Sequence, residues 1–285
     1  MGVCMSMKRL LLAFVLLSTA CDEETEQPAT SSTTNVSSST SGGGGQGGAN
    51  TGGGGSDPGC DPTDIAPKLH YRFEGDATNA GELGSEHDGI AELVTYVPGK
   101  IGQAVKFDGP VCEMAAPPPS HVDLPGTAAL LQTYPELTIG LWYRLPAMTT
   151  KTDCVPYLLK CRGQGSGFET YYGPAALPGE LTTCFTESDN MTSSCRSHQG
   201  TVDEWHHLLY RYDGNALEIY LDNELVLTMD TALSIFGSVL DNLDVGRFSF
   251  FDVDELKLYD QVFDPEIQCT EVIGGCWRNG SCVMP

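Results

Sequence analysis

Apolar and polar residues alternate with a period of two in several windows of the chain, which predicts β-strands. In residues 137–145, LTIGLWYRL, the alternate positions from Leu137 to Leu145 share one face. Residues 204–226, EWHHLLYRYDGNALEIYLDNELV, hold three short runs separated by turn signals at 213–215 and 222–224. This segment therefore predicts a meander of three strands. Helical periodicity is weak and confined to the surroundings of 127–132 and 265–270.

Many short strands separated by Gly, Pro, Asn and Asp turns are typical of an antiparallel all-β domain. The fold class that we predict is a two-sheet jelly-roll sandwich, preceded by a disordered linker.

Two adjacent histidines, His206 and His207, raise the question of a metal site or a proton shuttle. Neighbouring residues of a strand point to opposite faces, so the pair cannot hold one ion from a regular strand. His206 is in phase with Leu208, and His207 is in phase with Arg211, which we expect to face outward. We interpret both histidines, and Trp205 before them, as structural residues.

The first twenty residues have the pattern of a secretory signal. Lys8 and Arg9 precede an apolar run at 10–17, which is too short to span a bilayer. Ser18-Thr19-Ala20-Cys21 then resembles a bacterial lipobox, in which Cys21 would be lipidated. Cleavage at Ala20 by an ordinary signal peptidase is the alternative. We predict an exported, membrane-anchored lipoprotein of the cell envelope or surface.

Residues 21–59 are rich in Gly, Ser and Thr and contain no aromatic side chain. Such a segment cannot bury enough surface to offset its ordering entropy, so we expect a flexible, lipid-anchored linker. The remaining residues, 60–285, have the length of one all-β domain with a Cys-rich extension at 269–285.

The chain carries 38 acidic and 15 basic residues, a formal net charge of −23. No basic stripe offers contacts to phosphates, so nucleic acid is not an expected partner. Anionic membrane surfaces are repelled as well, which leaves the lipid anchor as the only expected membrane contact.

Nine cysteines remain after Cys4 and Cys21, an odd number that leaves at least one unpaired. In an exported protein they predict a disulfide framework. The gaps between close pairs are longer than zinc sites use. Local spacing makes Cys184–Cys195 and Cys276–Cys282 plausible bridges, although connectivity does not follow from sequence. The nine are Cys60, Cys112, Cys154, Cys161, Cys184, Cys195, Cys269, Cys276 and Cys282.

The folded part resembles the laminin-G-like, concanavalin A-like jelly rolls over about residues 68–268. The resemblance rests on "LHYRFEGDATNAG", on the run "YVPGKIGQAVKFDG", on "LTIGLWYRL", on the hairpin at 204–226 and on "FFDVDELKLYDQVFDPEIQ". It implies the fold and no particular ligand, since this fold hosts many functions.

The resemblance also implies a calcium site between the loop after the first strand and the start of the last strand. The corresponding residues are Glu74, Asp76, Asn79 and Asp254. The family often has Asp in place of Glu74 and Asn79, and fewer carboxylate charges predict weaker Ca²⁺ binding. The alternative is that these are solvated loop residues.

Catalytic motifs are absent from the sequence. Some glucanases with this fold carry Glu-x-Asp-x-x-Glu on one strand, and the nearest match is Asp252-Val253-Asp254-Glu255 without a third acid in register. No Gly-x-Ser-x-Gly, His-Glu-x-x-His or P-loop occurs. We therefore predict a protein that is not an enzyme.

The aromatic residues of the Cys-rich region 154–195 suit either glycan or protein contact or burial against the sheet, and we favour burial. The function that we predict is a non-catalytic binding module for a carbohydrate or a protein. A structural envelope component and a glycoside hydrolase with an unrecognised site are the alternatives.

Overall fold

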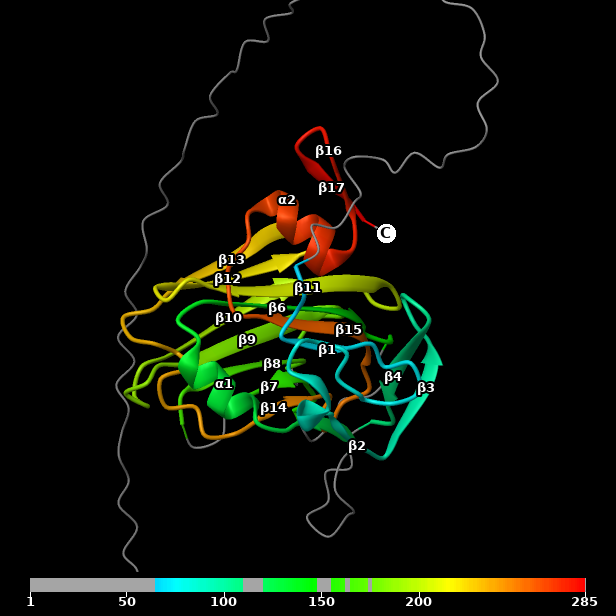
Figure 1. Cartoon of the computed structure of the whole chain (residues 1–285), viewed down its shortest axis with the longest axis horizontal. Coiled ribbons are helices and arrows are strands. Elements are labelled where there is room, and N and C mark those ends of the chain that lie inside the picture. The colour runs from blue at the N-terminus through cyan, green and yellow to red at the C-terminus, as the bar shows by residue number, and fades with distance from the viewer. Residues whose placement is uncertain (1–64, 110–119, 148–154, 162–164, 174–175, 285) are drawn as a thin grey trace, which may run out of the picture. The chain divides into compact units, whose positions relative to one another are not determined.

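The computed structural model describes residues 65–109, 120–147, 155–161, 165–173 and 176–284. They form two antiparallel sheets stacked face to face, which confirms the predicted sandwich (Figure 1). The expected signal peptide, Cys21 and the linker at 21–59 lie outside these residues, as do Cys60, Cys112 and Cys154. None of the helices in the described ranges is long and apolar enough to cross a bilayer.

The larger sheet has eight strands in the order β13-β12-β11-β6-β15-β4-β3, with β1 also paired to β15. Strands β4 and β1 share one edge of β15, along its first and second halves respectively. The strands are β1 (Leu69–Tyr71), β3 (Val94–Pro98), β4 (Gln103–Phe107), β6 (Leu137–Arg144), β11 (Trp205–Tyr212), β12 (Ala216–Leu221), β13 (Glu224–Asp230) and β15 (Asp252–Tyr259).

The smaller sheet has seven strands in the order β10-β9-β8-β7-β14-β5-β2. The 3-10 helix η1 (Gly84–His87) precedes β2, and helix α1 (Thr127–Thr133) follows β5, where weak helical periodicity predicted it. The strands are β2 (Ile90–Glu92), β5 (His121–Leu124), β7 (Tyr157–Lys160), β8 (Gly167–Tyr171), β9 (Glu180–Thr186), β10 (Ser193–Gln199) and β14 (Leu243–Val245).

The predicted meander is present as β11, β12 and β13. Asp222 and Asn223 join β12 to β13 with positive φ angles of 51° and 66°. Two central residues with positive φ form the hairpin turn whose twist matches that of the flanking strands. Asp and Asn tolerate this conformation better than most residues, which explains why the short turn signal in the sequence was sufficient.

The apolar faces predicted from the alternation meet between the two sheets. Leu137, Ile139 and Leu141 of β6 are fully buried, in one cluster with Leu208 and Tyr210 of β11. Burial of such side chains contributes about 1.5–3 kcal/mol each, so this layer is the main source of stability.

Two aromatic residues of the region 154–195, Phe168 and Phe185, are buried in the same core. Tyr157, Tyr171 and Tyr172 are only half-buried. The favoured interpretation, burial of these aromatics, therefore holds for the phenylalanines and only in part for the tyrosines.

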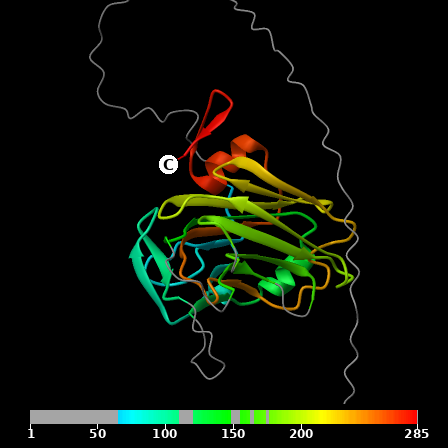
Figure 2. The ribbon, with the colours of Figure 1, turned by 180° about the vertical axis from the view of Figure 1, so that it is seen from behind.

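Residues that follow β15 fold back over the outer face of the larger sheet (Figures 1 and 2). Helix α2 (Pro265–Ile267) and the π-helix η2 (Gln268–Ile273) bring Val272 against Leu209 and Tyr259 in a second small apolar cluster. A hairpin of β16 (Cys276–Arg278) and β17 (Ser281–Val283) follows. The outer face is thus covered beneath this extension.

Disulfides hold both the smaller sheet and the extension. Cys184 bonds to Cys195, its register partner on the neighbouring strand, as the spacing suggested. The suggested pair Cys276–Cys282 is wrong, because Cys282 bonds to Cys269. The register of the last hairpin sets Cys276 opposite Val283 and Cys282 opposite Trp277, and Cys282 bonds to the first turn of η2. Cys276 is also disulfide-bonded, and among the described cysteines Cys161 is a free, buried thiol.

The bridge between Cys269 and Cys282 closes a segment of 13 residues and is expected to stabilise the fold. Replacing both cysteines by alanine should lower the free energy of unfolding by about 3 kcal/mol, since the unfolded chain regains the entropy of an open loop. Guanidinium denaturation without reductant measures this. Thr228→Ala on the exposed side of β13 is the control. A loss below about 1 kcal/mol would contradict this expectation and show that the remaining contacts, including the disulfide of Cys276, hold the extension without this bridge.

Candidate functional site

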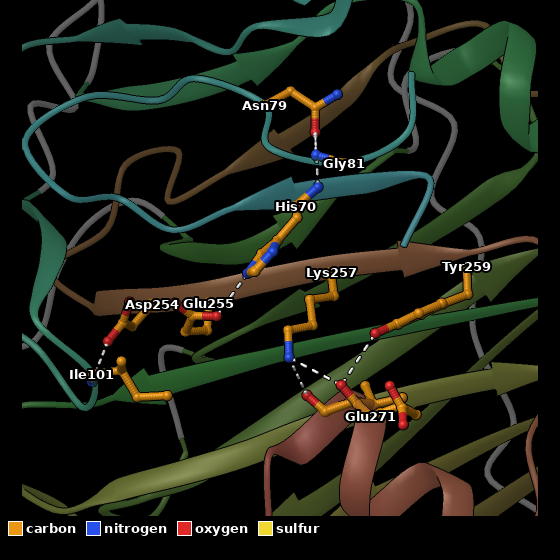
Figure 3. A network of polar contacts seen from close by, with 10 residues as sticks. His70, Asn79, Gly81, Ile101, Asp254, Glu255, Lys257, Tyr259 and Glu271 are labelled. Carbon is orange, nitrogen blue, oxygen red and sulfur yellow. Dashed lines mark hydrogen bonds and ion pairs between the residues drawn. The ribbon is translucent and has the colours of Figure 1, made fainter. Parts of the chain in front are cut away.

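Strand β15 carries four charged residues in a segment that is otherwise buried core: Asp252, Asp254, Glu255 and Lys257. Burying a charge is unfavourable unless it is paired and hydrogen-bonded. Each of the four contacts a different part of the chain, and Figure 3 shows three of these contacts. The strand therefore brings together elements that are far apart in sequence.

A β-bulge lets two neighbouring acids of β15 share one face. The pairing with β6 shifts register between Asp254 and Lys257, and Glu255 has a positive φ of 49°. The extra residue leaves Val253 and Leu256 in the core and turns both Asp254 and Glu255 away from it. Such bulges redirect side chains and are common beside functional sites.

The carboxylate of Asp254 lies in the turn between β3 and β4. Its Oδ2 accepts a hydrogen bond of 2.9 Å from the backbone amide of Ile101. Its Oδ1 is buried and has no hydrogen-bond partner among the residues that the structure describes, and the residue is 0 % exposed. Burial raises the pKa of Asp254 to about 7, although the amide of Ile101 lowers it in part. Oδ1 of Asp254, an acid that is partly protonated near pH 7, is thus able to accept a further contact.

The same turn holds the carboxylate of Glu74, which accepts a hydrogen bond from the amide of Gln103 at 3.0 Å. A Cβ at Gly99 would lie 2.6 Å from Asp254 Oδ2, and a Cβ at Gly102 would overlap the Glu74 carboxylate. Two glycines are therefore needed for the backbone to approach both acids. This explains the Pro-Gly-Lys-Ile-Gly run in physical terms.

Glu255 pairs with His70 of β1, with 2.7 Å between its Oε2 and Nε2 of the ring. Burial alone would raise the pKa of Glu255, but the hydrogen bond and charge of His70, with Lys257 nearby, lower it below the ordinary value. The first strand is therefore tied to the last strand by a largely buried polar pair.

Lys257 secures the C-terminal extension. Its Nζ donates to the carbonyl oxygens of Glu271 and Val272 at 3.0 and 3.3 Å, and Tyr259 donates to the Glu271 carbonyl at 3.1 Å (Figure 3). The last carbonyls of a helix lack partners within it, so a lysine is favourable here. Burial lowers the pKa of Lys257, and the charges of Glu255 and Glu271 oppose this shift.

At the start of β15, the buried Asp252 is paired with the partly exposed Arg144. Arg144 donates from Nε and Nη2 to Oδ2 of Asp252 at 2.9 and 2.6 Å. Its guanidinium lies over the ring of Trp205, 5.0 Å from the centroid. These residues and Lys106 occupy one cross-strand row through β11, β6, β15 and β4. The row holds the guanidinium in one orientation between an acid and an indole.

A cavity of about 400 Å³ opens beside this row. We call it the Arg144 pocket, and its lining residues are Lys106, Phe107, Asp108, Arg144, Pro146, Asp203, Phe250 and Asp252.

The Arg144 pocket combines one aromatic wall with several polar groups. The ring of Phe250 is held by Phe251 and Tyr172, with centroids at 5.6 and 6.3 Å. Asp252 occupies two of the five N–H donors of the Arg144 guanidinium. Apolar walls with a few fixed polar groups are typical of small-ligand sites. The arrangement can bind a polar ligand that has one apolar face.

The four residues of the expected calcium site are brought together only in part. Asp254 and Glu74 meet at the β3–β4 turn, as described above. Asp76 and Asn79 direct their oxygens into their own loop: Asp76 accepts from Thr78, and Asn79 accepts from the amides of His70 and Gly81. The described residues contain no group of three or more His, Cys, Asp or Glu arranged for a metal ion. The open oxygen of Asp254 fits a hard cation, whereas Oδ1 of Asn79 already accepts two hydrogen bonds and Oδ1 of Asp76 accepts from Thr78.

The two histidines diverge, as the alternation predicted. His206 lies between Asp222, at 2.7 Å from Nδ1, and the amide of Thr201, at 3.0 Å from Nε2. His207 contacts Trp142 edge-on, with 5.1 Å between ring centroids. His207 lies on the outer face of the sheet, as expected, but it is not exposed to solvent. Helix η2 covers that face, and the residue is 0 % exposed. Burial lowers the pKa of His207 to about 3.

Sequence reasoning named Asp252 as part of an acidic motif but missed the pocket beside it. Lys106, Arg144, Asp203 and Phe250 come from four separate segments. The one signal that was available is Arg144, a charge at the end of an otherwise apolar strand.

Comparisons with known proteins support the fold and leave the family open. No protein-family description and no curated protein matches the chain. Domain 4 of an extracellular arabinanase from Geobacillus stearothermophilus, in complex with arabinotriose, is similar with a TM-score of 0.53 and 16 % identity, covering 73 % of this chain and 98 % of that one.

Receptor-binding regions of toxins are similar as well. The botulinum neurotoxin serotype D binding domain has a TM-score of 0.54 with 11 % identity. The match covers 71 % of this chain and 49 % of the toxin domain. The binding domain of Paraclostridial Mosquitocidal Protein 1 has a TM-score of 0.54 with 10 % identity, over 70 % and 50 %. This chain spans about half the length of those toxin domains. These structures are binding domains rather than catalytic ones.

The raised pKa of Asp254 makes stability depend on pH. Because the folded state holds this proton up to about pH 7 and the unfolded chain releases it near pH 3.8, stability falls as pH rises between these values. Asp254→Asn removes the buried charge and keeps the acceptor for Ile101. At pH 8 with chelator, the variant should be more stable than the native protein by roughly 2–4 kcal/mol, and at pH 4 the difference should vanish.

Urea denaturation at the two pH values measures this difference. Glu224→Gln, an exposed acid on β13, is the matched control and should change neither value. An Asp254→Asn variant that is less stable at pH 8 would contradict the interpretation of Asp254 as an uncompensated buried acid.

Proposed function

We propose that the protein is a non-catalytic module that binds a carbohydrate in the Arg144 pocket. The observation that carries this proposal is the guanidinium of Arg144, held between Asp252 and Trp205 at the rim of a cavity with an aromatic wall. Saccharides present an apolar C–H face and a ring of hydroxyls, and they bind through aromatic packing and fixed polar groups.

The chemistry of the pocket favours a small polar ligand over a protein partner. Acids and bases are interspersed around it, and its volume of about 400 Å³ lies in the range of small-molecule sites. The similar structures also support a binding role, since one of them is a domain in complex with arabinotriose.

The proposal includes a laminin-G-like module, as the sequence resemblance implies, and a bound Ca²⁺ ion. Asp254 and Glu74 would hold the ion at the β3–β4 turn, with Asp76 and Asn79 as the further candidates. A bound cation would neutralise the buried carboxylate of Asp254 and fix the turn. It would act on the pocket indirectly, because Asp252 and Asp254 belong to the same strand.

Display at the cell envelope completes the proposal. The disulfides are typical of proteins that fold outside the cytoplasm. A lipid on Cys21 and a Gly/Ser/Thr-rich tether over residues 21–59 would keep the module near a membrane and allow it to search for ligands. Mass spectrometry of the membrane fraction tests the lipid on Cys21.

A glycan array that includes arabinan oligosaccharides tests the ligand class. With the chain produced from residue 21 onward and Cys21→Ser, we expect binding that Arg144→Ala weakens by about tenfold or more, since hydrogen bonds to charged groups are worth about 1.5–3 kcal/mol. Arg196→Ala, an exposed arginine on β10 of the other sheet, is the matched control. Equal weakening by both variants, or no glycan binding at all, would refute the proposal.

The contribution of Ca²⁺ is measured separately. Calcium chloride should raise the melting temperature of the native chain at pH 8, and Asp254→Asn should abolish the increase, because the variant lacks the anionic ligand. An equal increase in both proteins would rule out Asp254 as a calcium ligand, while leaving the carbohydrate proposal untouched.

A further inference from the structure

A second cavity of about 400 Å³ lies on the smaller sheet and shares no residue with the Arg144 pocket. We call it the Asp244 pocket. Its polar lining residues are Asp123, Lys160, Asp241, Asn242, Asp244 and Arg247. No part of the proposed function uses these groups.

Three charged residues of the Asp244 pocket lie side by side on three neighbouring strands. In the register, Asp244 of β14 is the partner of Asp123 on β5 and of Lys160 on β7. Two like charges directly opposite each other on adjacent strands are destabilising. The sheet therefore holds two carboxylates together at a cost in stability, next to a single lysine.

One oxygen of Asp244 lacks a partner. The residue is 7 % exposed, and its side chain lines the cavity. Oδ2 accepts a hydrogen bond from Nε of Arg247, whereas Oδ1 is buried without any hydrogen bond in the described part of the chain. Burial raises the pKa of Asp244, and Arg247 opposes this shift. A buried acceptor of this kind requires a donor.

The two cations of the pocket do not supply that donor. Arg247 is engaged with Oδ2 of Asp244, and Nζ of Lys160 lies over the ring of Tyr157, 5.1 Å from its centroid. Asp123 accepts a long hydrogen bond of 3.4 Å from Asn242, and Asp241 is exposed. Among the described lining residues, three carboxylates therefore face two cations, an excess of negative charge.

We propose that the Asp244 pocket binds the ammonium group of an amino sugar, as a second ligand site on the sheet opposite the Arg144 pocket. An ammonium group supplies three donors and a positive charge, which match the open oxygen of Asp244 and the neighbouring Asp123. The exposed side chain of Leu240 offers an apolar surface for the sugar ring. The net charge of −23 draws cationic ligands toward the protein.

Glucosamine tetramer at pH 6, where its amines are protonated, is the probe, and the fully N-acetylated tetramer is the matched neutral ligand. NMR titration of the chain produced from residue 21 onward, with Cys21→Ser, should show saturable shifts at the amides of Asp123, Asp241 and Asp244. The acetylated tetramer should bind at least tenfold more weakly at these amides. Asp244→Asn should weaken glucosamine binding by about tenfold or more.

Asp123→Asn provides a second test, since it leaves the Asp244–Arg247 pair intact and should also weaken binding. Glu224→Gln, an exposed acid on the other sheet, is the control for general loss of charge. Equal binding of both tetramers, shifts away from the pocket, or saturable shifts at these amides with calcium chloride alone at lower concentration than glucosamine would each overturn the proposal. These outcomes do not depend on whether the Arg144 pocket binds a glycan.

Discussion

The structure depends on how strand β15 buries its charges. Asp254, Glu255 and Lys257 lie in the middle of an eight-stranded sheet, where an unpaired charge has no water to solvate it. Removing one partner of a buried ion pair typically costs about 3–5 kcal/mol, so each of these residues requires its own contact. Those contacts come from β1, from the β3–β4 turn and from the C-terminal extension. One strand thereby connects two early segments of the domain with its C-terminal end.

This arrangement also gives the larger sheet two different halves. At the end of β15 the extension covers the outer face, where His207 is fully buried and the half-buried Lys257 donates to carbonyls of η2. At the start of β15 the face remains open, and the charges of Asp252 and Arg144 border a cavity. The same strand thus builds a closed, stabilising half and an open half that can bind a ligand. Asp254 lies between them, and one of its oxygens has no partner within the described ranges.

Much of the fold was predictable because its signals are local. The alternation in β6, β11 and β12 and the two-residue turn at Asp222 and Asn223 each depend on neighbouring residues only. The divergence of His206 and His207 follows from the same period of two. Within the candidate calcium set, the resemblance named Asp254 and Glu74, which the structure places at one turn. It also named Asp76 and Asn79, which accept hydrogen bonds from Thr78 and from the amides of His70 and Gly81 instead of meeting the other two.

What the sequence by itself determined is the class of the domain, the strands that form its core and the absence of known catalytic motifs, since these depend on residue type and spacing along the chain. Only the tertiary structure decided the rest. The bulge that turns both Asp254 and Glu255 outward, the partner of Cys282 and the covering of His207 all depend on which distant segments meet. Both pockets arise in the same way, because a cavity is formed by strands that are neighbours in space and remote along the chain.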